Sequence, residues 1–65
     1  MIEKWAAEVI AQLRMLGITQ KEFAKRCGYS EPYVSQVLRG QKNTDQAKNT
    51  IMSTLSKLKE EAAHL

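Results

Sequence analysis

Apolar residues in the first part of the chain recur at the three- and four-residue steps of an amphipathic helix. Between positions 2 and 16 they are Ile2, Trp5, Ala6, Val9, Ile10, Leu13 and Leu16. This spacing places the apolar side chains on one face of a helix. Gly17 follows, at a position where helices commonly end in a left-handed residue. The pattern predicts a helix over residues 2–16 that contributes most of the core.

The next segment, residues 19–28, predicts a short second helix. Thr19 and Glu22 have the spacing of a capping box, in which a hydroxyl and a carboxylate each accept from a free backbone N–H. A narrow apolar stripe follows, and cations occupy much of the remaining circumference. The stripe consists of Phe23, Ala24 and Cys27. Gly28 tolerates positive φ, so the chain is expected to turn sharply there.

A third helix is predicted to end at Gly40, and its first residue is open between two alternatives. Ser30 is a natural N-cap, with Pro32 in the first turn where a missing N–H costs nothing. Glu31 is the other possible N-cap, because the residue before a proline avoids the α region. The apolar stripe of this helix is Val34, Val37 and Leu38. Its opposite face is therefore polar and expected to point outward.

The last helix is predicted to follow a polar loop at residues 41–43, with Asn43 or Thr44 as its cap. It carries a narrow apolar seam consisting of Ala47, Ile51, Leu55, Leu58, Ala62 and Leu65. This seam either closes the core against the first helix or packs against a partner chain. The residues proposed for such a dimer interface are Ile51, Leu55, Leu58 and Ala62. A break near Ser53 and Thr54 would divide the segment into two helices.

These elements predict an all-α fold, a small four- to five-helix bundle forming one domain over residues 1–65. A chain of 65 residues buries only ~60% of the surface that its unfolded form exposes, which leaves little room for an enzyme cleft. Catalysis needs a nucleophile, a base and an orienting group that converge. The chain has one histidine, His64, and Asp45 is its only aspartate. The protein is therefore not expected to be an enzyme, and no cofactor is expected.

The formal net charge is +3, and the charges are unevenly distributed. Residues 18–43 contain five cations and two glutamates, whereas residues 1–17 and 44–65 each sum to zero. The five cations are Lys21, Lys25, Arg26, Arg39 and Lys42. Because the whole positive excess lies in the central segment, a polyanionic partner is expected to bind there.

The cysteine count and the hydropathy of the N-terminus exclude several classes of protein. Cys27 is the only cysteine, so the chain cannot form an internal disulfide or a zinc site with several thiolates. It is expected to be a small buried apolar residue, and no metal site is expected at His64 either. The N-terminus has no continuous apolar run of the kind found in signal peptides or membrane spans. A soluble cytoplasmic protein is expected.

Two short helices around a glycine-containing turn form a helix-turn-helix unit. Residues 18–40 resemble the Cro/repressor-type helix-turn-helix family of phage and bacterial regulators. The residues that carry the resemblance are Gln20, Glu22, Phe23, Ala24, Gly28, Ser30, Val34, Leu38 and Gly40. The resemblance implies a lambda-repressor-like fold and a sequence-specific regulator that binds double-stranded DNA, usually as a dimer. It also implies that the second helix of the motif enters the major groove.

By this resemblance, the base-contacting positions of the family correspond to Glu31, Pro32 and Gln36, and Tyr33 and Ser35 can join them. A glutamine amide can pair with N6 and N7 of adenine together, which makes Gln36 the strongest of these. Glu31 can accept from cytosine N4, or act only at the helix terminus. Tyr33 either reaches the DNA or lies half-buried over the turn. Pro32 offers only apolar contact, for example to a thymine methyl group.

Phosphate contacts are predicted around the same helix, because hydrogen-bond donors and cations there would face the sugar-phosphate backbone. The predicted residues are Gln20, Lys21, Ser30, Arg39, Lys42 and Asn43. For Lys21, Lys25 and Arg26 a purely solubilising role is the stronger alternative.

The leading hypothesis is a transcriptional regulator of the Cro/repressor type that occupies an operator. The alternative is a protein-interaction adaptor or antitoxin-like module that retains the fold and binds a protein partner through its last helix. Salt-dependent binding to a DNA duplex would separate the two hypotheses.

Overall fold

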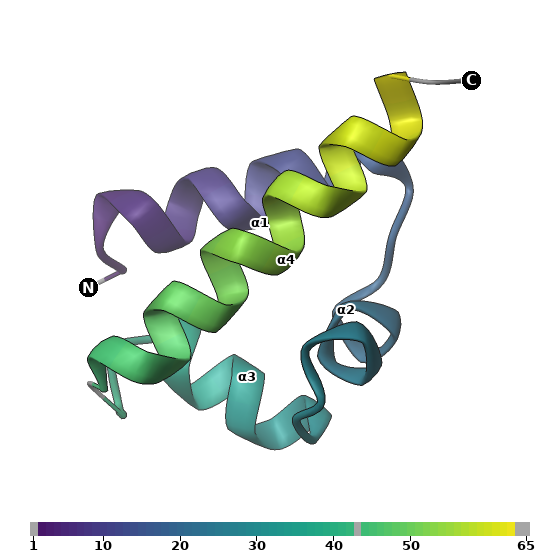
Figure 1. Cartoon of the computed structure of the whole chain (residues 1–65). Coiled ribbons are helices and arrows are strands. Elements are labelled where there is room, and N and C mark those ends of the chain that lie inside the picture. Colours follow the sequence, from purple (N-terminus) through teal and green to yellow (C-terminus); the bar gives the residue numbers. More distant parts are fainter. Residues whose placement is uncertain (1, 43, 64–65) are drawn as a thin grey trace.

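The computed structural model describes residues 2–42 and 44–63, and the described chain forms four helices without a strand (Figure 1). They are α1 (Lys4–Leu16), α2 (Gln20–Cys27), α3 (Glu31–Leu38) and α4 (Asp45–Ala63). The all-α prediction is confirmed. Of the predicted four or five helices the structure has four, since α4 runs through Ser53 and Thr54 without a break. The Thr54 hydroxyl donates to the Thr50 carbonyl at 2.8 Å, so this polar residue is accommodated inside the helix.

The helices are arranged so that α3 lies along one edge of the molecule. In Figure 1, α4 runs diagonally across the front of α1, and the α2–α3 pair lies below them. Helix α4 packs against both α1 and α2, and α2 packs against α3. The C-terminal end of α4 extends away from α3 toward the opposite corner. This arrangement leaves one side of α3 without a neighbouring helix.

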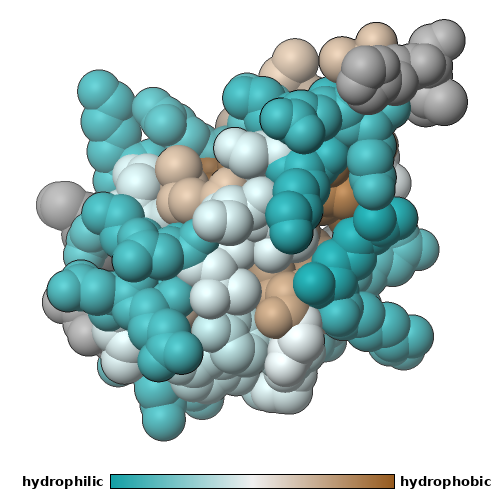
Figure 2. All heavy atoms as spheres, in the orientation of Figure 1, coloured by the Kyte–Doolittle hydropathy of each residue, from teal (hydrophilic) through white to brown (hydrophobic). Residues whose placement is uncertain are grey.

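Each helix contributes apolar side chains to one core. The largest fully buried side chains are Phe23, Leu38, Ile51, Val9 and Val34. Within the described residues no polar or charged side chain is buried. In Figure 2 strongly hydrophilic side chains lie mainly around the outside of the visible face, side chains of intermediate hydropathy fill its middle, and apolar ones form small patches. The stripes predicted from the sequence therefore do converge on a common interior.

The turn between α2 and α3 depends on a left-handed residue at Gly28, which has φ of +82°. The N–H groups of Gly28 and Tyr29 donate back to the carbonyls of Lys25 and Ala24, at 3.2 and 2.9 Å. These bonds satisfy the last carbonyls of α2 while the chain reverses its direction. A side chain larger than hydrogen is disfavoured at this φ, which explains the glycine.

The seam of α4 closes the core of a single chain. Ile51, Leu55 and Leu58 are 0%, 6% and 4% exposed, and they cluster with buried residues of the other helices. The assignment of these three residues to a dimer interface is therefore corrected, because a side chain already buried in one chain has no surface left for a second. Of the four residues proposed for that interface, only Ala62 is exposed.

Replacing Ile51 by alanine should lower the free energy of unfolding by about 2–5 kcal/mol, because it removes buried methyl groups and leaves a cavity. The neighbouring Met52→Ala, at a side chain that is 38% exposed, should cost less than about 1 kcal/mol. Urea unfolding at two protein concentrations measures both effects. If the loss for Ile51→Ala appears only at the higher concentration, Ile51 belongs to an intermolecular contact instead.

Candidate nucleic-acid interface

Helix α3 begins with a side-chain cap that defines its first residue. The Ser30 hydroxyl accepts from the Tyr33 N–H at 3.3 Å, and Ser30 has an extended backbone conformation. Ser30 is thus the N-cap, and the alternative of Glu31 as the cap is wrong. Pro32 is the second residue of the helix, where an N–H would have no intrahelical partner. The start of α3 is therefore fixed by the Ser30 cap and by Pro32 in the first turn.

The uncovered side of α3 is polar. Val34, Val37 and Leu38 point into the core, whereas Glu31 and Pro32 are exposed. Ser35 and Gln36 are half-buried on the flank of the helix. The outward polar face predicted from the sequence is thus present, with groups that can donate to and accept from a ligand.

Tyr33 lies over the turn rather than freely in solvent. It is half-buried, and its ring meets that of Tyr29 edge-on, with centroids 4.9 Å apart and an interplanar angle of 64°. Aromatic pairs favour this geometry. The position matches the predicted alternative of a half-buried ring that supports the turn.

Ser35 joins α3 to the beginning of α2. Its hydroxyl donates to the side-chain carbonyl Oε1 of Gln20 at 2.9 Å, and both residues are half-buried. The hydroxyl proton of Ser35 is therefore already used within the protein. Ser35 was predicted to contact bases and Gln20 to contact phosphate, and in the structure these two side chains are hydrogen-bonded to each other. The pattern of helical faces gave no signal for this bond.

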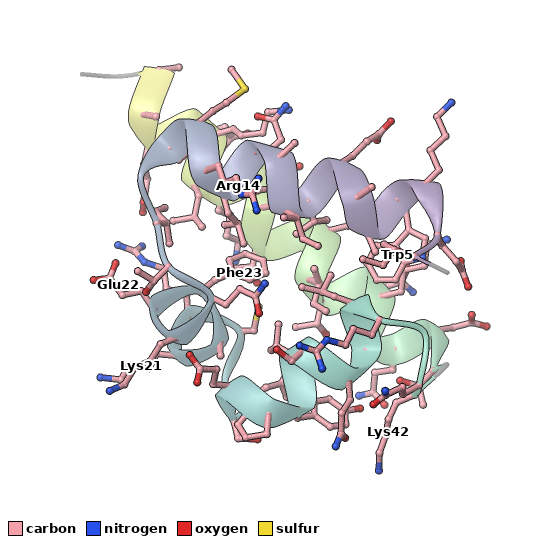
Figure 3. All side chains as sticks on the ribbon, turned by 180° about the vertical axis from the view of Figure 1, so that it is seen from behind. Trp5, Arg14, Lys21, Glu22, Phe23 and Lys42 are labelled. Carbon is pink, nitrogen blue, oxygen red and sulfur yellow. The ribbon has the colours of Figure 1, made fainter. Side chains whose placement is uncertain are left out.

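Cations lie on both sides of α3. Figure 3 shows Lys21 near the start of α2 and Lys42 beyond the end of α3, each pointing away from the body of the molecule. The N–H groups of Gln41 and Lys42 both donate to the Gln36 carbonyl, at 2.9 and 3.3 Å, which folds the loop back onto α3. Arg39, directly after α3, is also exposed. Asn43, the remaining predicted phosphate ligand, lies outside the described residues.

The Arg26 side chain points toward α4, where it forms an ion pair with Glu61. Its Nη1 atom lies 3.2 Å from the Glu61 Oε2 atom on α4, and both side chains are more than half exposed. An ion pair so accessible to water stabilises the fold little. It does, however, turn the Arg26 charge toward α4.

Arg14 is a cation near this surface that the sequence analysis did not include. It lines a hollow of about 220 Å³ together with Ile10, Leu13, Ile18, Thr19 and Gln20. Figure 3 shows it on the side of α1 that faces the helix-turn-helix unit. The residue was missed because residues 1–17 sum to zero charge, which concealed a single cation at the end of that segment. Its position three residues before Gly17, and hence beside the start of α2, was the available signal.

Cys27 is a packing residue. Partial burial raises the pKa of its thiol, and a hydrogen bond with the Thr54 side chain opposes this effect only in part. The thiol is thus protonated near neutral pH, which disfavours nucleophilic or metal-binding roles. Among the described residues no three His, Cys, Asp or Glu side chains are grouped as a metal site would require. No helix of the described chain is long and apolar enough to cross a membrane.

A family model described as helix-turn-helix matches residues 10–48, which is more than half of the chain. The chain belongs to the Cro/repressor-type helix-turn-helix family. This is a family of DNA-binding domains, and the matched region extends from the second half of α1 to the first turn of α4. It includes Arg14, Gln20, all of α3 and Lys42. The search of curated proteins and the search of solved structures each found no match.

The cap of α3 can be tested by Ser30→Ala. Loss of the bond to the Tyr33 N–H should lower the free energy of unfolding by about 1 kcal/mol, and Ser30→Asp, which retains an acceptor, should restore most of it. Ser56→Ala, at an exposed position inside α4, is the matched control and should be neutral or slightly stabilising. Equal effects of the two alanine variants in thermal or urea unfolding would contradict the capping role.

Proposed function

We propose that this helix-turn-helix protein is a sequence-specific transcriptional regulator that inserts α3 into the major groove of an operator. The observation that carries the proposal is the uncovered polar face of α3, with Lys21 on one side and Lys42 on the other. The core holds the opposite face of the same helix, so the polar face is presented in a fixed orientation.

The dimensions of α3 suit this role. Its eight residues span about 12 Å, and the major groove, about 12 Å wide, admits an α-helix with its side chains. Gln36 is proposed to pair with adenine through its amide. Glu31 and Pro32, at the exposed start of the helix, are proposed to contact neighbouring base edges. For Glu31 this would be cytosine N4, and for Pro32 a thymine methyl group.

The surrounding residues are proposed to hold phosphates, which would fix the register of α3 on the duplex without reading sequence. Lys42 and Arg39 would do so beyond the end of α3, and Lys21 near the start of α2. Gln20, Ser30 and Asn43 would add hydrogen bonds. Each neutralised phosphate releases counterions, so affinity should fall steeply as salt rises.

Regulation would follow from occupancy of the operator, as for a phage or prophage Cro/repressor-like protein, and would need no catalysis. A single α3 reaches only a few base pairs, so two copies on a pseudo-palindromic site would extend the sequence that is read. Half-sites would then lie about one helical turn apart. The contact between copies would have to use surfaces other than the buried seam of α4.

The proposal predicts different behaviour for two variants. Gln36→Ala should cost about 1–3 kcal/mol on the preferred duplex and relax discrimination at one base position. Lys42→Ala should weaken binding to all duplexes alike and reduce the slope of log affinity against log salt by about one. Selection of bound sites from random duplexes, followed by fluorescence anisotropy at several salt concentrations, measures both effects.

Two outcomes would count against the proposal. If the natural chain fails to bind any duplex even at low salt, the fold serves another role, such as a protein adaptor. If Gln36→Ala and Lys42→Ala affect every sequence identically, the assignment of base reading to α3 fails. Lys57→Ala, at an exposed position on α4, is a control for the general effect of removing a cation.

A further inference from the structure

We propose that Arg14 and Gln20 form a phosphate-binding site at the junction of α1 and α2, and that Ser35 is the residue that positions Gln20 for it. The ligand is a phosphodiester group of the DNA backbone. This inference rests on the proposed DNA-binding function and adds to it a contact from α1, which lies outside the helix-turn-helix unit.

The hollow at this junction has the chemistry of an anion site. Its volume is about 220 Å³, and its polar lining residues are Arg14, Thr19 and Gln20. No carboxylate lines it. The other hollows described on this molecule each place a carboxylate beside their cations, Glu8 in one case and Glu61 in two. An apolar floor of isoleucine and leucine side chains would limit the access of water to the bound group.

The bond from Ser35 determines which end of the Gln20 amide is free. Because the Ser35 hydroxyl donates to Oε1 at 2.9 Å, this bond engages the amide oxygen and leaves the two N–H groups of the amide nitrogen available. None of the side-chain hydrogen bonds found among the described residues involves that nitrogen. Gln20 therefore presents two N–H donors rather than an acceptor, which is the orientation that a phosphate requires.

Arg14 supplies the charge. Among the described residues no carboxylate forms an ion pair with it, unlike Arg26, which pairs with Glu61. Its guanidinium is a planar fork that can donate two parallel hydrogen bonds to phosphate oxygens. Figure 3 shows Arg14 on the side of α1 facing α2, across the junction from Lys21 and far from Lys42. Arg14 and Lys42 would thus bind phosphates at opposite ends of the proposed DNA-binding surface.

This arrangement links phosphate binding to base reading. Ser35 belongs to α3, whereas the group that it orients belongs to α2, so the phosphate site is built partly by the reading helix. If α3 shifts in a mismatched groove, the bond to Gln20 is strained and the phosphate contact weakens with it. Ser35 thereby acts as a positioning residue rather than as a base reader.

The first test is Arg14→Gln, measured by fluorescence anisotropy on random-sequence duplexes of about 20 base pairs, two helical turns. We expect about tenfold weaker binding at moderate salt, as for loss of one charge-assisted contact. The slope of log affinity against log salt should fall by about 0.9, the value for one phosphate. Lys59→Gln removes the same charge from an exposed site on α4 beside Glu8 and should change neither quantity.

The second test separates the roles of Gln20 and Ser35. Ser35→Ala should weaken binding about threefold on all duplexes without changing the salt slope, because no charge is lost. In a Gln20→Ala background, Ser35→Ala should have no further effect, and Ser35→Thr, which keeps the hydroxyl, should bind like the natural chain. The side-chain amide signals of Gln20 in nitrogen-resolved NMR should shift when a duplex is added. Thermal unfolding confirms that each variant is folded.

The results distinguish this site from the general proposal. If the natural chain binds DNA with a strong salt dependence but Arg14→Gln behaves like Lys59→Gln, the site does not exist while the DNA-binding function stands. Additive losses for Gln20→Ala and Ser35→Ala would overturn the positioning role of Ser35. If the natural chain binds no duplex, both proposals fall together.

Discussion

The burial of one side of α3 is the constraint on which the rest of the structure depends. Val34, Val37 and Leu38 share a core with Phe23 of α2 and Ile51 of α4. Because the two faces of a short helix are opposite each other, fixing the apolar face also fixes where the polar face points. A recognition surface on a chain this small therefore requires no separate scaffold. The same side-chain packing that folds the domain also orients the polar face of α3.

Local interactions at the turn fix the orientation of α2 relative to α3. The left-handed conformation at Gly28 ends α2, and the Ser30 hydroxyl caps α3, so the two helices meet at a defined angle. The edge-on contact of Tyr29 and Tyr33 covers the same turn. The bond between Ser35 and Gln20 adds a second connection between the two helices. The helix pair is thereby joined at its turn and across its open side, which limits how far α3 can move without disturbing α2.

Residues of the same type have different roles because of their neighbours. Arg26 lies in the charged central segment, yet its guanidinium pairs with Glu61 of α4. Arg14 lies in a segment that is neutral overall, yet it borders a hollow without any carboxylate. The net charge of a segment thus indicates that a polyanion can bind, and only the surroundings of each cation indicate where. Long-range pairing across 35 positions decides the difference.

Features that depend on near neighbours in the chain could be predicted from the amino-acid sequence. Helical periodicity, the cap at Thr19, the turn at Gly28 and the outward face of α3 were all correctly predicted, because each involves residues within about one turn of each other. Helix boundaries agreed closely for the same reason, although the start of α3 remained open between Ser30 and Glu31. The structure settled it through one hydrogen bond, from the Tyr33 N–H to the Ser30 hydroxyl.

Features that depend on residues far apart in the chain could not be predicted in this way, because they are set by how the helices pack. Periodicity shows that the seam of α4 is apolar, but it cannot tell whether another helix or another molecule covers it, and the fold assigned Ile51, Leu55 and Leu58 to the core. Likewise, the packing of separate helices brings Ser35 into hydrogen-bond distance of Gln20 and places Arg14 beside α2. Helical period places a residue on a face of its own helix, whereas the residue's partner is set by packing between helices.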